Sequence, residues 1–151
     1  MKRIVHLAAA LAVTATLTAS PPALSQDMTY EQALTDIEAT LGFVPDFFKQ
    51  QPKAGFAGAW LQLKGLEFSG DTALTAKVKT LIELAVVSQI PCQYCIWADT
   101  EAARALGATE EEIAEAVAVA ATGRYWSTVL NGRQIDFETF KQDFTRLLGA
   151  E

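Results

Sequence analysis

Hydrophobic residues recur every three or four positions along most of the chain after residue 28, the spacing that gathers them on one face of an α-helix. The pattern predicts helices over residues 29–41, 53–68, 75–89 and 136–148. Two further helices are expected, one holding both cysteines and ending near residue 107 and one beginning after Thr109. No run of alternating polar and apolar residues is long enough to predict a strand. We therefore expect an all-α fold built as a single helical domain.

Residues that start and stop helices support these boundaries. Thr29 and Gln32 have the spacing of a capping box, and Thr109 precedes three glutamates that would stabilise the positive end of the next helix. Gly42 and Gly107 stand where glycine caps a helix C-terminus. The segment 42–52 is a connector rich in aromatic residues. The apolar stripes contain Phe56, Trp60 and Leu63 in the second helix, Val78, Leu81, Ile82, Ala85 and Val86 in the third, and Phe137, Phe140, Phe144 and Leu147 in the last.

The first 25 residues have the pattern of a secretory signal peptide. Lys2 and Arg3 precede an apolar stretch, which is followed by small residues up to Ser25. The apolar stretch is shorter than the roughly 20 residues that span a bilayer, so a cleaved leader is favoured over an anchor. We expect cleavage after Ser25 and a mature domain of residues 26–151. Such a protein would be periplasmic or secreted, where disulfides persist.

Removal of the leader changes the chemistry available. His6 is the only histidine, so the mature chain would have no imidazole as a base near neutral pH. Loss of Lys2 and Arg3 leaves 10 basic against 18 acidic residues, a net charge of −8. A chain so acidic repels phosphate backbones and anionic lipids, which argues against nucleic acid and membrane partners.

Both cysteines lie in the segment QIPCQYCIW, separated by two residues. Positions i and i+3 share a helix face, so Cys92 and Cys95 can form a disulfide. As a staple such a short loop contributes only about 2 kcal/mol, whereas a helix N-terminus stabilises a thiolate. A redox role is favoured, and a structural bridge stays open. We expect no metal and no cofactor, because zinc would need further ligands and haem attachment would need histidine at Ile96.

The segments 81–121 and 124–132 resemble the carboxymuconolactone decarboxylase-like family, in particular its alkylhydroperoxidase-D-like branch, and the resemblance extends over residues 41–132. Its most specific part is Cys-x-Tyr-Cys inside two helices. It implies an all-helical domain that assembles as trimers or hexamers and carries a dithiol that reduces peroxides or disulfides. By resemblance, Cys95 is the attacking thiol and Cys92 the resolving thiol. The helix dipole alone would instead favour Cys92 as the more acidic thiol.

The chain departs from the family pattern at two positions. The acid expected twelve residues before the first cysteine is Thr80, and the histidine expected four residues after the second is Asp99. Glu83, one turn on from Thr80, is either a displaced relay acid with a raised pKa or an ion-paired surface acid. Asp99 is either a proton donor, if buried and neutral, or a solvated acid. The candidate catalytic residues are Cys95, Cys92, Glu83 and Asp99.

Several other side chains have two interpretations. Tyr94, Trp97 and Trp126 either shape an apolar pocket over the thiols or pack in the core. Arg104 and Arg124 are candidate ion-pair partners of Glu83 or Asp99. The phenylalanine stripe of the last helix is either core or a subunit interface.

Three functions are consistent with these features. The first is an exported oxidoreductase that reduces hydroperoxides or disulfides and is recharged by an extracytoplasmic thiol donor. The second is a binding or assembly module with a structural disulfide, which the altered relay positions favour. The third is decarboxylation of a lactone, against which the acidic charge and the absence of histidine argue. The first is our hypothesis.

Overall fold

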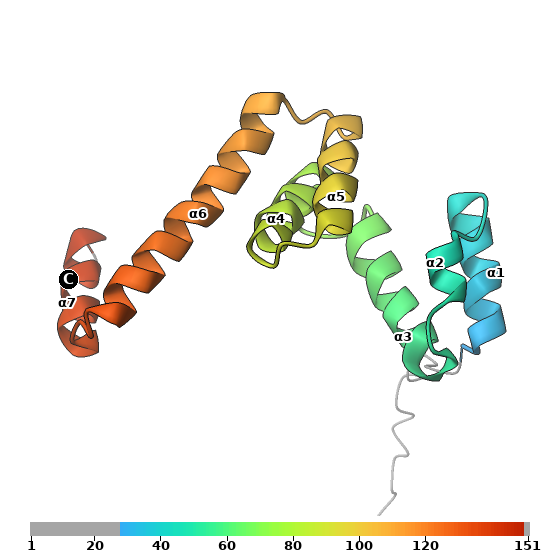
Figure 1. The fold of residues 1–151 in the computed structure, drawn as a ribbon, viewed down its shortest axis with the longest axis horizontal. Coiled ribbons are helices and arrows are strands. Elements are labelled where there is room, and N and C mark those ends of the chain that lie inside the picture. The colour runs from blue at the N-terminus through green and yellow to red at the C-terminus, as the bar shows by residue number, and fades with distance from the viewer. Residues whose placement is uncertain (1–27, 150–151) are drawn as a thin grey trace, which may run out of the picture. The chain divides into compact units, whose positions relative to one another are not determined.

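The computed structural model describes residues 28–149, and the packing of these residues divides them into two compact units, residues 28–58 and 59–149. The expected signal peptide and its cleavage site lie outside the described residues. No strand occurs in residues 28–149, which confirms the all-α class. The helices are α1 (Tyr30–Leu41), α2 (Asp46–Lys49), α3 (Lys53–Leu63), the π-helix η1 (Lys64–Phe68), α4 (Ala76–Gln89), α5 (Gln93–Ala105), α6 (Glu110–Gly132) and α7 (Phe137–Leu147) (Figure 1).

In the first unit, α1 begins and ends where its caps predict. The Thr29 hydroxyl accepts a hydrogen bond from the Gln32 amide, and the Gln32 side chain accepts one from the Thr29 amide at 2.8 Å. Gly42 ends the helix with a φ of 83°, a left-handed conformation that glycine adopts without strain. Ala33 and Ile37 form its buried face.

The expected connector 42–52 contains a short helix, α2, whose Phe48 is buried and packs edge-on against Phe56 at 6.0 Å. The predicted helix 53–68 is less regular than its pattern indicates. Ala54 and Gly55 are non-helical, and the last five residues widen into the π-helix η1. Apolar periodicity does not report such changes of winding, because it records only which residues share a face.

In the second unit, α4 packs against both α5 and α6 (Figure 1). Leu84 and Val87 of α4, Ala103 of α5 and Ile113 of α6 are buried together. This small core fixes the start of α5, and with it the cysteine pair, relative to α4.

The apolar stripe of α4 is not its buried face. The buried residues of this helix are Lys79, Thr80, Leu84 and Val87, whereas Val78, Ile82 and Val86 of the predicted stripe are exposed. Lys79 is tolerated inside because its ammonium donates to the carbonyls of Leu66 and Ser69, at 2.5 and 3.1 Å. The exposed stripe lies instead on the side of α4 next to α6.

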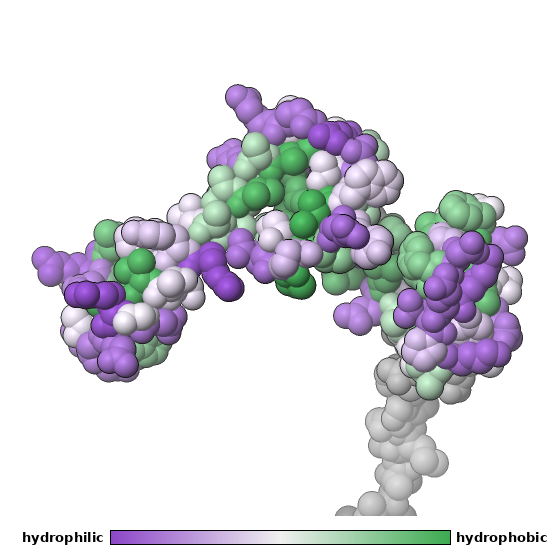
Figure 2. Space-filling view, viewed as in Figure 1, coloured by the Kyte–Doolittle hydropathy of each residue, from purple (hydrophilic) through white to green (hydrophobic). Residues whose placement is uncertain are grey.

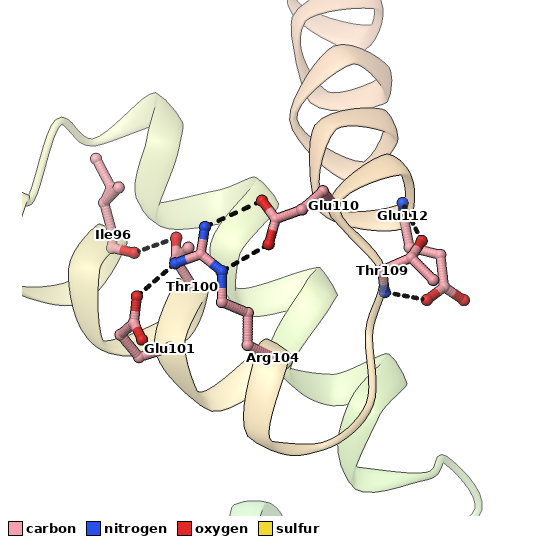
Figure 3. A network of polar contacts seen from close by, with 7 residues as sticks. All are labelled: Ile96, Thr100, Glu101, Arg104, Thr109, Glu110 and Glu112. Atoms are coloured by element: carbon pink, nitrogen blue, oxygen red, sulfur yellow. Dashed lines mark hydrogen bonds and ion pairs between the residues drawn. The ribbon is translucent and has the colours of Figure 1, made fainter.

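A polar network joins α5 to α6 (Figure 3). Arg104 donates two hydrogen bonds to the Glu110 carboxylate, at 2.7 and 3.0 Å, and one to Glu101. Thr109 and Glu112 form the capping box that starts α6. Arg104 is thus engaged with Glu110 and Glu101, so the expectation that it partners Glu83 or Asp99 is not supported.

The last helix, α7, begins at the predicted position, with Asp136 accepting a hydrogen bond from the Thr139 amide at 2.8 Å. Its phenylalanine stripe is not part of a core within this chain, since Phe137, Phe144 and Leu147 are exposed. Among residues 28–149, no helix is both long and apolar enough to cross a membrane.

Candidate functional site

The cysteine pair stands at the first turn of α5. Cys92 is the N-cap residue and Cys95 occupies the third helical position, so the expectation that both lie within the helix is corrected by one residue. A disulfide joins them, with their Cα atoms 5.4 Å apart. The Cys92 sulfur accepts a hydrogen bond from the Cys95 amide at 3.3 Å. Pro91 lies just before the cap residue. A proline has no amide hydrogen, and at this position the helix needs none.

Backbone contacts hold Cys92 in place in addition to the disulfide. Its amide donates to the carbonyl of Val87 at 3.4 Å, and its carbonyl accepts from the amide of Ile96 at 2.9 Å. Cys95 is half-buried against the core cluster that includes Leu84. The start of α5 is therefore held by backbone hydrogen bonds that involve neither sulfur atom.

Asp99 follows Cys95 by one turn on α5, which places the two side chains on the same face of the helix. One carboxylate oxygen of Asp99, Oδ2, is shielded from solvent and has no hydrogen-bond partner among the described residues. Burial, and then repulsion from Glu67, raise the pKa of Asp99 above the usual range of an aspartate. A carboxyl group in such a place is easier to protonate than one in water.

Glu83 of α4 belongs to the same electrostatic cluster. Burial raises its pKa first, followed by repulsion from Asp99 and from Glu67. Asp99 thus acts on Glu83 in the folded chain, although the two residues were chosen separately from the sequence. The third member, Glu67 of η1, was not predicted, because nothing in its local sequence indicates where η1 packs on α4.

Thr80 has no role that the structure connects with the thiols. It is buried, and its hydroxyl donates to the carbonyl of Ala76 at 3.0 Å within α4. The position where the family pattern has an acid is thus occupied by a threonine whose hydroxyl bonds to a carbonyl of its own helix. The carboxyl groups with raised pKa values are those of Glu83 and Asp99.

The aromatic residues near the cysteines are not packed in the core. Tyr94 is 79% exposed and Trp97 is 70% exposed, three residues apart on α5 beside the disulfide. Trp126 lies far along α6, where its ring meets Tyr125 edge-on at 5.3 Å. Of the two interpretations given for these three residues, packing in the core of this chain is wrong, since all three are exposed. Tyr94 and Trp97 are exposed apolar side chains on the first two turns of α5.

The sequence pattern of the carboxymuconolactone decarboxylase family matches residues 54–136, which include α4, α5, α6 and the cysteine pair. The chain belongs to this family. Its fold is similar to the crystal structure of the alkylhydroperoxidase AhpD core from Rhodospirillum rubrum, with a TM-score of 0.62 and 30% sequence identity. That match covers 74% of this chain and 85% of the other.

A second relative of this carboxymuconolactone decarboxylase family protein is uncharacterized protein 4 in the cox locus of Paracoccus denitrificans. The two are 41% identical over 71 residues, which is 47% of this chain. The match spans 63% of the length of that relative.

Proposed function

We propose that this family member is a thiol-dependent oxidoreductase whose Cys92–Cys95 dithiol reduces hydroperoxides or disulfides. The observation that carries the proposal is the disulfide across the N-terminus of α5, followed one turn later by a carboxyl group with a raised pKa. A dithiol needs a stabilised thiolate and a proton source for the leaving group, and this turn offers both. The similarity to an alkylhydroperoxidase core supports the same chemistry.

The reaction with a hydroperoxide balances as follows. The thiolate of one cysteine attacks the outer peroxide oxygen, the O–O bond breaks, and an alcohol leaves with one proton. The second thiol then attacks the resulting sulfenic acid, forms the disulfide and releases water. A thiol donor regenerates the pair by thiol–disulfide exchange. By family resemblance Cys95 attacks and Cys92 resolves.

The carboxyl groups assist in their protonated form. An ionised Asp99 would repel a thiolate at Cys95, but a protonated Asp99 can donate to the departing alkoxide. Its raised pKa increases the fraction of molecules in that form. Glu67 contributes by repelling the ionised form of Asp99, which raises the pKa of Asp99, and the negative charges of Asp99 and Glu67 raise the pKa of Glu83.

The proposal extends to the compartment. A signal peptide over residues 1–25 would deliver the enzyme outside the cytoplasm, where cytosolic reductants do not reach it. An extracytoplasmic thiol donor is then required. The intact mass of material from a secreting host tests the export step, with Gln26 expected as the first residue.

The activity test follows hydroperoxide consumption by the purified protein with a small dithiol as reductant. The wild type is expected to consume hydroperoxide. The Cys95→Ser variant should remain helical, and its rate of hydroperoxide consumption should be at least a hundredfold lower. Asp99→His restores the residue that the family pattern places there and should raise the rate. Thr80→Glu is a poorer test, because it places a carboxylate at a buried position.

The control is Thr100→Ser, next to Asp99. It keeps the hydroxyl that donates to the Ile96 carbonyl, and it should leave the rate unchanged. Absence of turnover with alkyl hydroperoxides and with small disulfides, using several dithiol donors, would refute the proposal. A structural disulfide would then be the better interpretation.

A further inference from the structure

The two sulfur atoms of the cysteine pair have different surroundings at the start of α5. Cys92 is the N-cap residue, and its sulfur accepts a hydrogen bond from the Cys95 amide at 3.3 Å. This amide is one of those that a helix leaves unpaired in its first turn, where the helix dipole is positive. A thiolate at Cys92 would therefore receive a hydrogen bond and a favourable potential from the same turn.

Cys95 lies in more apolar surroundings. Its side chain packs against the buried cluster that joins α4, α5 and α6, whereas Cys92 is not among the residues of the second unit that pack there. Hydrophobic residues also gather at the surface over α4 and the adjoining part of α6 (Figure 2). Apolar packing disfavours a charged sulfur, because it displaces the water that would solvate the thiolate.

Acidic side chains also lie closer to Cys95 than to Cys92 along the helix. Asp99 follows Cys95 by four residues and Cys92 by seven, a rise of about 6 Å against about 10 Å. Glu67 repels Asp99, and both repel Glu83, so the three carboxyl groups form one cluster. Every ionised member of this cluster disfavours a thiolate at Cys95 more than one at Cys92.

The elements packed against the start of α5 bring no charged side chain close to Cys92 in sequence. The last turn of α4, residues 85–89, is uncharged, and its Val87 carbonyl accepts two backbone amides, one of them that of Cys92. The first turn of α5 contains no acidic residue. The ion pairs that join α6 to the other two helices lie at its first turn, which follows the opposite end of α5: Arg104 with Glu110, and Lys77 with Glu112.

We propose that Cys92 is the sulfur through which this protein exchanges with thiols and disulfides, the reverse of the order that the family pattern implies for the two cysteines. This role of Cys92 rests on the proposed oxidoreductase function and concerns its thiol–disulfide steps. The amide bond to the Cys92 sulfur, the apolar packing of Cys95 and the carboxyl cluster near Cys95 all act in the same direction.

Reduction of a disulfide by the dithiol balances as follows. The Cys92 thiolate attacks one substrate sulfur, the substrate S–S bond breaks, and a thiolate leaves and takes a proton from solvent. Cys95 then attacks the Cys92 sulfur of the mixed disulfide, and the second substrate thiol leaves with the proton of Cys95. Two electrons have passed to the substrate, and the Cys92–Cys95 disulfide has formed.

A thiol donor reverses these steps through the same mixed disulfide. The donor thiolate attacks the Cys92 sulfur and Cys95 leaves, and a protonated Asp99 one turn further on can supply the proton that Cys95 takes up. A second donor thiolate attacks the donor sulfur, Cys92 leaves as the thiolate, and the donor ends as a disulfide. Cys95 therefore never forms a bond to the donor.

The first test finds which thiol ionises first in the reduced wild type. Iodoacetamide alkylates thiolates, so less than one equivalent is added at about pH 6.5 and the label is located by fragmenting the peptide that contains both cysteines. At least tenfold more label is expected on Cys92 than on Cys95. Label that is mainly on Cys95, or equal on the two, would overturn the role of Cys92.

The second test compares two single-cysteine variants. Cys95→Ser keeps the amide that bonds to the Cys92 sulfur, and Cys92→Ser places a favoured N-cap residue at the start of α5, so both should remain helical. Each variant reacts with oxidised glutathione across a range of pH. The midpoint of the rate should lie at least about one pH unit lower for Cys95→Ser than for Cys92→Ser. Equal midpoints, or the opposite order, would contradict the proposal.

Asp99→Asn, added to each single-cysteine variant, provides the matched comparison. It should lower the midpoint of Cys95 and leave that of Cys92 nearly unchanged, since Asp99 is nearer to Cys95. Equal shifts would show that the carboxyl cluster does not separate the two thiols, which counts against the proposal. Turnover with the label on Cys95 refutes only the role of Cys92, whereas absence of turnover refutes the proposed function whichever thiol is labelled.

Discussion

Asp99 places a carboxyl group on the same face of α5 as Cys95, one turn further from the start of the helix. Its pKa is raised by burial and by Glu67, so ionisation of Asp99 costs more free energy in the folded chain than in the unfolded one. The unfolded state therefore releases this proton at lower pH. Stability falls as pH rises from the ordinary range of an aspartate to the raised pKa.

The Asp99→Asn variant has no carboxyl group at this position, so it does not carry the free-energy cost of ionising Asp99 in the folded chain. We expect the thermal midpoint at pH 7 to rise by a few degrees at most, because Asp99 is only partly buried and solvent screens the repulsion. The gain should vanish below about pH 3, where both states are protonated. Thermal unfolding followed by circular dichroism at both pH values tests this. The exposed Asp71 provides the matched control, and Asp71→Asn should show no such pH-dependent gain.

The candidate site could be predicted in part from the sequence. Cys92 and Cys95 were found because two cysteines at this spacing can meet without help from the rest of the fold. Glu83 and Asp99 were found because a carboxylate in an apolar stretch, or in place of a histidine, is unusual. Glu67 could not be found, since its influence on the other two depends on how η1 packs on α4.

At the scale of helices, Lys79 shows how a charged residue can hold two elements together. Its buried ammonium donates to two carbonyls at the C-terminal end of η1, the end that attracts positive charge. Lys79→Met keeps the apolar stem but leaves these carbonyls without their donor. We expect a loss of about 1–3 kcal/mol in the free energy of unfolding, measured by urea denaturation.

Lys77→Met is the matched control on the same helix. The Lys77 ammonium pairs with Glu112 at 2.8 Å, and both side chains remain about one-third exposed to solvent. Such pairs contribute between 0 and about 1 kcal/mol, so the control should be milder. Equal losses for both variants would contradict the role of Lys79.

Helix boundaries were predicted well wherever a side chain closes the first turn. Thr29, Thr75, Thr109 and Asp136 all accept a backbone amide at the start of a helix, because capping depends on neighbours in sequence. The buried face of α4 was not predictable in the same way. Its apolar stripe lies on the side next to α6, and Lys79 and Thr80 are inside because carbonyls of η1 and of α4 itself satisfy them.

At the scale of the whole molecule, the stripes of α4 and α7 have one property in common. Both are strongly apolar in sequence and exposed in the single chain. Their periodicity is what predicted a helical core, yet periodicity cannot tell a core within one chain from an interface between copies.

The disulfide also affects the whole molecule, through the stability it adds. A closed loop of four residues restricts the unfolded chain little, so its loss should cost no more than about 2 kcal/mol. The contacts of Cys92 with Val87 and Ile96 would keep the start of α5 in place after reduction. We expect the reduced protein and the Cys95→Ser variant to have melting temperatures close to that of the oxidised wild type.

The reduction potential of the Cys92–Cys95 pair should lie above about −300 mV. Structural disulfides have potentials below that value, which is why the glutathione pool does not reduce them. Equilibration with a dithiol buffer, read by trapping free thiols, measures it. A potential below that value together with a much lower melting temperature for the serine variant would identify the pair as a structural staple.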